Sequence, residues 1–304
     1  MVTYDEKYLQ QIALMTRLLT SVKRESCFAL KGGTAINLFI HDLPRLSIDI
    51  DLTYLPYQPR EISLITINDS LIRIADDINL RNKGISILFK KNNDLVQKLI
   101  VGNVERIIIE PNEILRGNLY PIELRNLCPK AESLLGITLN EIPTLSYEEI
   151  YAGKICAALD RQHPRDLFDI LYLYQTTGIT TALLDAFVVY LACCSRPIHE
   201  LLNPKQNISE DNFKREFFGM TNRVIKFKDL IQIWKQLIQD LHKNLNDHHK
   251  RFLISIKEGT PEYKLLPFSN LEDFPALQWK LFNINKMTAA KKQMMLKKLH
   301  EIFL

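Results

Sequence analysis

The sequence lacks an apolar run long enough to cross a lipid bilayer. Its first residues, MVTYDEKYLQQ, also lack the basic segment followed by an apolar segment that is typical of a signal peptide. These absences argue against a membrane partner and against export. We therefore expect the protein to remain in the cytoplasm.

Paired cysteines are missing as well. The five cysteines are an odd number, none forms a Cys-x-x-Cys pair, and none has a histidine nearby at the spacing of a zinc site. This pattern predicts buried thiols and implies neither a disulfide framework nor a structural metal. We also find no internal repeat and no low-complexity segment.

A strong excess of one charge is absent. The formal net charge of +4 permits a nucleic-acid partner but does not require one. Hydrophobic residues make up 46% and charged residues 24% of the sequence, which is typical of a soluble globular protein. A chain of 304 residues can bury a sizeable core, and we expect two domains.

The most informative stretch runs from Phe28 to Tyr54. It begins with a short apolar run, turns at Gly32 and Gly33, and continues into a helical segment that starts at Thr34. This order predicts a strand, a turn and a helix. Glycines let backbone N–H groups approach an anion closely, and the N-terminus of a helix attracts negative charge. The turn therefore predicts a phosphate-binding site.

A second strand is predicted at 48–52, where apolar and acidic residues alternate. The period of two places Asp49 and Asp51 on one face of this strand. Two carboxylates that lie so close repel each other unless a cation lies between them, and Mg²⁺ binds one or two carboxylates together with substrate phosphates. By the same period, we expect the hydroxyl of Ser47 on the face that carries the aspartates.

A family resemblance rests on two motifs in this order, Lys31-Gly32-Gly33-Thr34-Ala35 and Arg45-Leu46-Ser47-Ile48-Asp49-Ile50-Asp51. They are similar to the signature of the DNA polymerase β-like nucleotidyltransferases. In their fuller form they resemble the AbiEii/AbiGii branch, the toxins of type IV toxin-antitoxin pairs, which include the MenT toxins. The spacer between the motifs is a little longer than in the tightest pattern of the superfamily, and the segment from His41 to Arg45 lengthens it.

The resemblance implies an α+β fold, in which a small mixed sheet flanked by helices is followed by a helical domain. It implies Mg²⁺ as cofactor and an NTP as substrate, with Asp49 and Asp51 as catalytic metal ligands. It also implies nucleotide contacts from residues around the glycine turn: Lys31, Gly32, Gly33, Thr34 and Ser47.

Two helices and three strands are predicted around this stretch. Helical periodicity marks 4–22 and 60–81, and β-branched runs mark strands at 85–89, 95–101 and 106–109. The last run leads into Glu110, and the resemblance implies a third metal-binding carboxylate there. Glu105 and Glu113 are rivals, and a strand-end glutamate that faces water is the alternative.

We expect a domain boundary near Pro143, which divides a nucleotidyltransferase domain at 1–143 from a helical domain at 144–304 that closes the nucleotide cleft. Two consecutive helices then carry Lys154 and Asp166. The resemblance implies that Lys154 binds the nucleotide phosphates and that Asp166 lies beside the metal. The residues alone would suggest an exposed pair of Asp166 with Arg165 at a helix start. We assign no general-base role to His163, because a lone histidine before a proline is more often a loop residue.

Several cationic residues are candidates for contact with RNA phosphates. They are Arg116 and Arg125, in a loop-like region, and Lys291, Lys292, Lys297 and Lys298, in the last predicted helix. A solvated helix face is the alternative for the lysines.

The predicted reaction is transfer of NMP from an NTP to an RNA acceptor, which the resemblance implies is the 3′ end of tRNA, so that translation is blocked. The resemblance also implies a separately encoded antitoxin as partner. Two alternatives stay open: transfer to a protein hydroxyl, and a regulator that binds nucleotide or RNA without catalysis. We further predict that a phosphate on Ser47 would compete with Mg²⁺ and the triphosphate.

Overall fold

The computed structural model describes residues 4–304, so the first three residues of the predicted first domain lie outside the described residues. The chain divides into two compact units. The first contains the residues up to Ser146 together with Phe218–Val224, and the second contains Tyr147–Phe217 and Ile225–Leu304. The fold is α+β, as the sequence predicted.

The first unit is built on a mixed sheet, whose seven strands within residues 4–304 run in the order β3-β4-β5-β2-β1-β7-β6. The strands are β1 (Phe28–Lys31), β2 (Asp49–Tyr54), β3 (Ile87–Asn92), β4 (Leu95–Val101), β5 (Ile107–Asn112), β6 (Glu123–Arg125) and β7 (Ile142–Thr144). β2 is antiparallel to β1 and parallel to β5. The helical elements of this unit are α1 (Glu6–Val22), α2 (Gly32–Thr34), η1 (Ala35–Ile40), α3 (Arg60–Arg81) and α4 (Pro129–Leu135).

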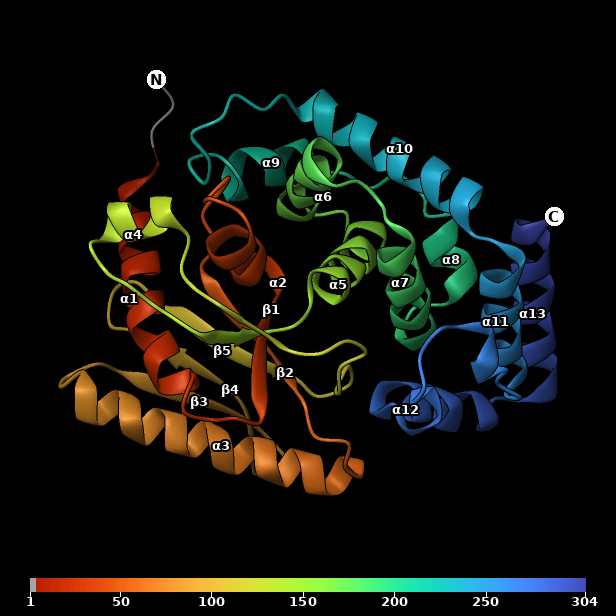
Figure 1. The fold of residues 1–304 in the computed structure, drawn as a ribbon, viewed down its shortest axis with the longest axis horizontal. Helices are drawn as coiled ribbons and strands as arrows, with labels where there is room; N and C mark the ends of the chain where they lie inside the picture. The colour runs from red at the N-terminus through yellow and green to blue at the C-terminus, as the bar shows by residue number, and fades with distance from the viewer. Residues whose placement is uncertain (1–3) are drawn as a thin grey trace. The chain divides into compact units, whose positions relative to one another are not determined.

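The two faces of the central strands differ in polarity. Ile50 of β2, Ile109 of β5 and Leu99 of β4 are register partners in turn, and all three are fully buried. The amphipathic helices α1 and α3 pack on the sheet and supply apolar side chains such as Leu18 and Leu71 to this core (Figure 1). Because side chains alternate along a strand, the residues between these apolar positions point to the opposite face.

Most helix and strand predictions for this unit are confirmed, with a few differences. The predicted helix at 34–40 begins earlier, at Gly32, and is wound as a π-helix over Ala35–Ile40. β5 continues past Glu110 to Asn112, so this glutamate lies within the strand and not at its end. The short elements α4, β6 and β7 were not predicted.

A segment from late in the chain belongs to the first unit. The N–H of Leu46 donates to the carbonyl of Met220 at 2.6 Å, and the hydroxyl of Thr221 donates to the carbonyl of Pro44 at 2.8 Å. Phe218–Val224 thus braces the loop that leads into β2. No sequence pattern predicted this return of the chain.

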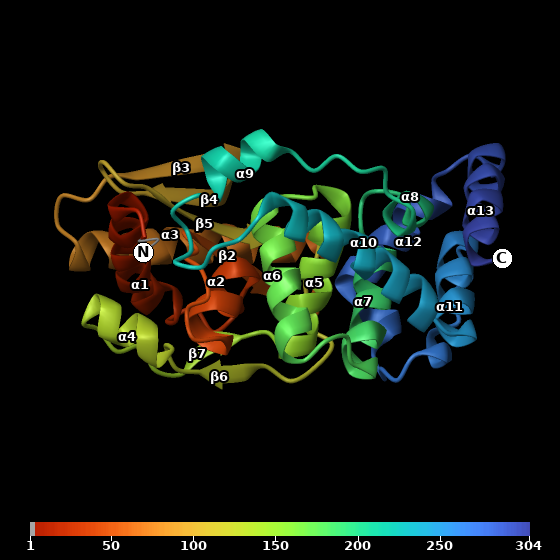
Figure 2. The same ribbon diagram turned by 90° about the horizontal axis from the view of Figure 1, so that it is seen from above.

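The second unit is helical in the part of the chain that the structure describes. Its helices are α5 (Tyr147–Asp160), α6 (Pro164–Thr176), α7 (Thr181–Cys193), α8 (Ile198–Leu202), α9 (Glu210–Glu216), α10 (Phe227–Asn244), α11 (Asp247–Glu258), η2 (Tyr263–Leu265), η3 (Leu271–Asp273), α12 (Pro275–Asn285) and α13 (Ala289–Phe303). α5 packs extensively on α7, and α11 lies beside α13 in both views (Figure 2). Within residues 4–304, no helix combines the length and the apolarity needed to cross a membrane.

Candidate functional site

The polar face of the sheet carries the carboxylates that the sequence singled out. Asp49 and Asp51 alternate with the fully buried Ile50 on β2, and both are half-buried. Asp51 pairs in register with Glu110 of β5, and Asp49 pairs with Ile108. Register partners on adjacent strands point to the same face, about 5 Å apart. The structure therefore brings Asp49, Asp51 and Glu110 to one face.

The two rival glutamates, Glu105 and Glu113, lie outside the strand positions that carry Asp49, Asp51 and Glu110. Glu105 lies in the bend between β4 and β5, and Glu113 follows β5. Glu113 contacts Arg60, whose Nη1 donates to its carbonyl at 2.6 Å and whose Nη2 lies 3.8 Å from its carboxylate. Of the three glutamates, Glu110 is the one that the strand register places beside Asp51.

A lysine lies on each side of these carboxylates. Lys31 of β1 is the register partner of Asp51, and Lys98 of β4 forms an ion pair with Glu110 at 3.2 Å. Burial lowers the pKa of Lys31, while the negative charges of Asp51 and Glu110 oppose this effect. Two lysines therefore flank the adjacent carboxylates of Asp51 and Glu110.

The glycine turn packs tightly against this site. Gly32 adopts a φ of +70°, and a Cβ there would collide with the carboxylate of Asp51. A Cβ at Gly33 would lie 2.7 Å from Nη2 of Arg45 and 2.8 Å from Oγ of Ser47. Gly32 therefore suits its position by its left-handed backbone and its close contact with Asp51, and a side chain at Gly33 would force Arg45 or Ser47 to move.

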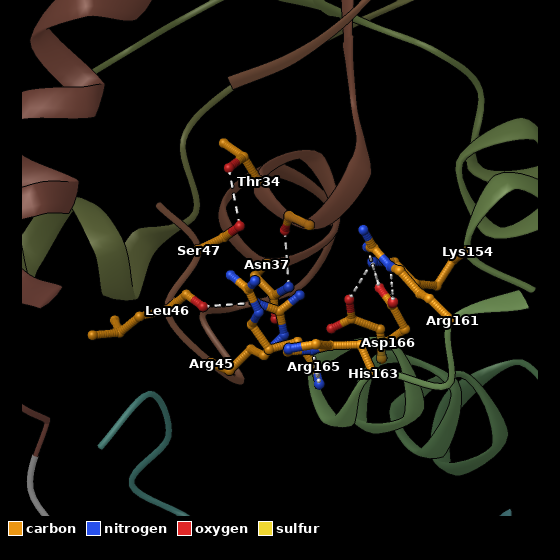
Figure 3. A network of polar contacts seen from close by, with 12 residues as sticks. Thr34, Asn37, Arg45, Leu46, Ser47, Lys154, Arg161, His163, Arg165 and Asp166 are labelled. Carbon is orange, nitrogen blue, oxygen red and sulfur yellow. Dashed lines mark hydrogen bonds and ion pairs between the residues drawn. The ribbon is translucent and has the colours of Figure 1, made fainter. Parts of the chain in front are cut away.

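Thr34 and Ser47 hold the turn against the start of β2. The hydroxyl of Thr34 donates to the carbonyl of Asp49 at 2.5 Å and lies 3.1 Å from the hydroxyl of Ser47 (Figure 3). Thr34 is fully buried, so its hydroxyl positions the first aspartate, and its contact with a nucleotide stays a prediction.

The structure corrects the expected orientation of Ser47. β2 begins at Asp49, so the alternation of a strand does not extend back to Ser47. The residue is 5% exposed, and its hydroxyl faces Thr34 inside the unit. The buried Arg45 lies beside it and donates from Nη1 to the carbonyl of Leu46 at 2.8 Å (Figure 3).

The donor set of the polar face suits Mg²⁺. Mg²⁺ prefers oxygen ligands and usually combines one or two carboxylates with water and substrate phosphates. Within residues 4–304, no three acidic, histidine or cysteine side chains gather into a ready-made metal cage. Asp49 and Asp51 on one strand face, with Glu110 beside Asp51, would leave coordination positions for water or a phosphate oxygen.

The second unit contains a buried ionic network between α5 and α6. Nζ of Lys154 lies 2.8 Å from Asp166 and 3.0 Å from Asp169, and none of the three side chains is more than 6% exposed. Arg161 also binds Asp166 through two hydrogen bonds, of 2.6 and 3.0 Å (Figure 3). Burial alone raises the pKa of Asp166, but Lys154 and Arg161 outweigh burial and hold that pKa well below its usual range.

The structure changes one expectation for this region and adds one residue to it. Asp166 does not form an exposed pair with Arg165, because it is buried and pairs with Lys154 and Arg161. Asp169 belongs to the network although the sequence analysis did not assign it to the site. Its spacing of three residues from Asp166 places both on one face of a helix, and that spacing is the signal that could have identified it.

His163 caps a helix. Its Nδ1 accepts from the backbone N–H of Arg165 at the start of α6, so Nε2 carries the proton and donates to Glu216 at 2.7 Å. Burial lowers the pKa of His163, although Glu216 opposes that effect. A capping role accounts for its position before Pro164.

The candidate RNA contacts differ in exposure. Arg116 is 2% exposed, and Arg125 forms an ion pair with Glu123, so neither position favours contact with RNA. On α13, the residues Lys291, Lys297 and Lys298 are exposed. Lys292 is half-buried, and its Nζ lies near Gly259 at the C-terminus of α11, where helix carbonyls attract a cation.

Comparisons with known proteins agree with these features. A profile of the family described as Nucleotidyl transferase AbiEii toxin, Type IV TA system, matches residues 13–283. None of the curated proteins matches the sequence. Among solved structures, the chain is similar to MenT4, a nucleotidyltransferase toxin from Mycobacterium tuberculosis H37Rv, with a TM-score of 0.60 and 16% identity. The similarity covers 91% of this chain and 95% of that chain, and it shows a shared fold.

Proposed function

The chain belongs to the AbiEii nucleotidyltransferase toxins of type IV toxin-antitoxin systems, and on that premise we propose that it transfers NMP from an NTP to the 3′ end of tRNA. The observation that carries the proposal is the carboxylate face, on which Asp49 and Asp51 share one side of β2 and Glu110 lies beside Asp51. Amino acids are attached at the 3′ end of tRNA, so such a transfer would block translation.

In this proposal the reaction needs Mg²⁺, which would polarise the α-phosphate and offset the charge that develops on the leaving pyrophosphate. Asp49 and Asp51 would hold the ion, and Glu110 would complete the coordination from β5. The acceptor hydroxyl would give its proton to a carboxylate of this face as its oxygen bonds to the α-phosphorus, and the bond to pyrophosphate would break. No histidine is required for this chemistry.

The triphosphate would bind at the glycine turn. Gly32 and Gly33 open a helical segment, so their backbone N–H groups are available to an anion. Lys31 adds a positive charge beside Asp51. The hydroxyls of Thr34 and Ser47 would not contact the triphosphate themselves. They would position the glycine turn by holding it against Asp49.

Lys154, a residue of the second unit, is proposed to bind a nucleotide phosphate. An ammonium group has three N–H donors, and in the described residues Asp166 and Asp169 account for two of them. One donor thus remains for a phosphate oxygen. Asp166 would then orient Lys154 instead of contacting the metal, which fits its burial and its two bonds to Arg161.

RNA is the proposed acceptor because three exposed lysines lie on α13, where they can contact a phosphate backbone. The family also supplies the second proposed partner, a separately encoded antitoxin.

The experiment combines the purified protein, Mg²⁺ and each NTP, labelled at the α-phosphate, with total tRNA. We expect label on tRNA with one preferred nucleotide and none when Mg²⁺ is chelated. Label on a polypeptide and none on RNA would show that the acceptor is a protein hydroxyl and not tRNA. An absence of label on both would contradict the proposal.

A further inference from the structure

A row of charged side chains, with a lysine at each end and two carboxylates between them, crosses four strands of the sheet in the first unit. Lys31 of β1 pairs in register with Asp51 of β2, and Asp51 pairs with Glu110 of β5. The register of β4 with β5 then places Lys98 opposite Glu110, because Leu99 pairs with Ile109. All four side chains therefore point to the same face.

The contact at the β4 end of the row is an ion pair. Nζ of Lys98 lies 3.2 Å from Oε1 of Glu110, and the two side chains are 35% and 48% exposed. Two carboxylates on adjacent strands repel each other, so a cation beside one of them stabilises the pair when no metal is bound. Lys98 supplies this cation from the protein itself.

Nζ of Lys98 contacts Oε1 of Glu110 from the β4 side, whereas a metal ion shared with Asp51 would approach Glu110 from the β2 side. Mg²⁺ binds carboxylate oxygen at about 2.0 to 2.1 Å and carries two positive charges, so its arrival at Glu110 would repel the ammonium of Lys98. The ion pair is part-exposed, and such pairs are weak. A divalent metal ion can therefore displace it, at a small cost in binding free energy.

We propose that Lys98 is an internal counter-ion that competes with the divalent metal for Glu110 and thereby sets the metal affinity of the site. This inference rests on the proposed function, because it takes Asp49, Asp51 and Glu110 as the metal ligands. Lys98 acts through Glu110 and is a positioning residue: it holds the carboxylate in the metal-free protein and releases it when the metal binds.

Lys90 provides a matched control. It lies on β3 as the register partner of Lys98, so it belongs to the same face one strand farther from Glu110. It is exposed, and the structure shows no ion pair to it within residues 4–304. Removing its charge changes the net charge of the face as much as removing that of Lys98, without freeing Glu110.

The test is calorimetric titration of the full chain with Mn²⁺, without nucleotide, for wild type, Lys98→Met, Lys90→Met and Asp49→Asn. We expect Lys98→Met to bind Mn²⁺ about threefold to tenfold more tightly than wild type. Lys90→Met should stay within about twofold of wild type, and Asp49→Asn should bind more weakly. Lys98→Gln, which keeps a polar side chain, should share the gain of Lys98→Met and replaces it if that variant does not fold.

The outcomes distinguish the proposed metal site from the proposed counter-ion role of Lys98. If wild type binds Mn²⁺ through Asp49 but Lys98→Met and Lys90→Met behave alike, the counter-ion role of Lys98 is wrong and the metal site stands. If wild type does not bind Mn²⁺, or if Asp49→Asn binds it as well as wild type, both claims fail. A purely structural role for Lys98 would lower the melting temperature and leave the Mn²⁺ affinity unchanged.

Discussion

Asp51 of β2 and Glu110 of β5 are direct register partners on parallel strands, although α3, β3 and β4 separate them along the chain. This pairing turns two distant acidic residues into neighbours on one face of the sheet. With Asp49 two residues before Asp51, it forms the acidic centre to which the glycine turn and both flanking lysines are adjacent.

Replacement of Gly32 by alanine should reduce transfer activity by more than its effect on stability explains. The φ of +70° opposes any side chain and costs about 1 to 2 kcal/mol. The added Cβ would also displace the carboxylate of Asp51. Gly84→Ala is the matched control, since Gly84 has a φ of +83° but no atom lies within 4 Å of the place that its Cβ would take. Urea unfolding and the transfer assay should show a comparable backbone cost for both variants, with activity lost only in Gly32→Ala.

Removal of Lys154 should destabilise the second unit in a pH-dependent way. Lys154→Met leaves Asp166 and Asp169 buried without their shared cation, which costs about 3 to 5 kcal/mol at neutral pH. In wild type the lowered pKa of Asp166 contributes stability above the unfolded pKa of about 3.9, and this contribution is lost as the pH falls toward the lower folded pKa. The difference in the free energy of unfolding between Lys154→Met and wild type should therefore become smaller below about pH 4.

Arg161→Met is the control for that experiment, because Arg161 also binds Asp166 but is 65% exposed. Its loss should cost only about 1 kcal/mol. Stability is measured by thermal unfolding from pH 3 to 8. If Lys154→Met and Arg161→Met lose equal stability, Lys154 is not the buried centre of the network.

Ser47 should tolerate loss of its hydroxyl but not addition of charge. Ser47→Ala removes one hydrogen bond to Thr34, at a cost of about 1 kcal/mol, and should retain most transfer activity. Ser47→Glu places a carboxylate in a site that is 5% exposed and close to Asp49, so activity and toxicity should fall. Because the hydroxyl is buried, phosphorylation would require the loop before β2 to open. Full activity in Ser47→Glu would end the prediction that this residue is a control point.

The exposed lysines of α13 should contribute to RNA binding. Neutralising Lys291, Lys297 and Lys298 together should weaken tRNA binding and make its salt dependence shallower by about one or two units of log–log slope, because fewer counterions are released. A variant of α10 that neutralises Lys228, Lys235 and Lys243 removes the same charge from another helix. If both triple variants change the slope equally in binding titrations over a range of salt concentrations, the face of α13 has no specific role.

Local patterns in the sequence predicted much of the fold. Periodicity placed α1 and α3, alternation placed Asp49 and Asp51 on one face of β2, and Pro164 marked the first residue of α6. Each of these signals lies within one element, where the spacing of side chains follows directly from backbone geometry. The predicted end of β3 at Phe89 was too early because Lys90, Lys91 and Asn92 are polar, yet an exposed strand at a sheet edge accommodates polar residues.

Contacts between distant parts of the chain were not accessible in the same way. The ion pair of Lys98 with Glu110 depends on the register of two strands, and the burial of Ser47 depends on where β2 begins. The return of Phe218–Val224 to the first unit depends on hydrogen bonds with the loop before β2. Such features arise from tertiary packing, and no local period reports them.

The most direct test of the account is the rate of NMP transfer by Asp49→Asn, compared with the exposed turn variant Asp94→Asn. Asn keeps the size of the side chain but removes a charge that, in the proposed mechanism, stabilises the transition state through the metal. We therefore expect kcat to fall about a hundredfold or more while the protein unfolds at the same denaturant concentration as wild type. Asp94→Asn should retain the wild-type rate. Normal turnover by folded Asp49→Asn would contradict the assignment of catalysis to the carboxylate face of β2.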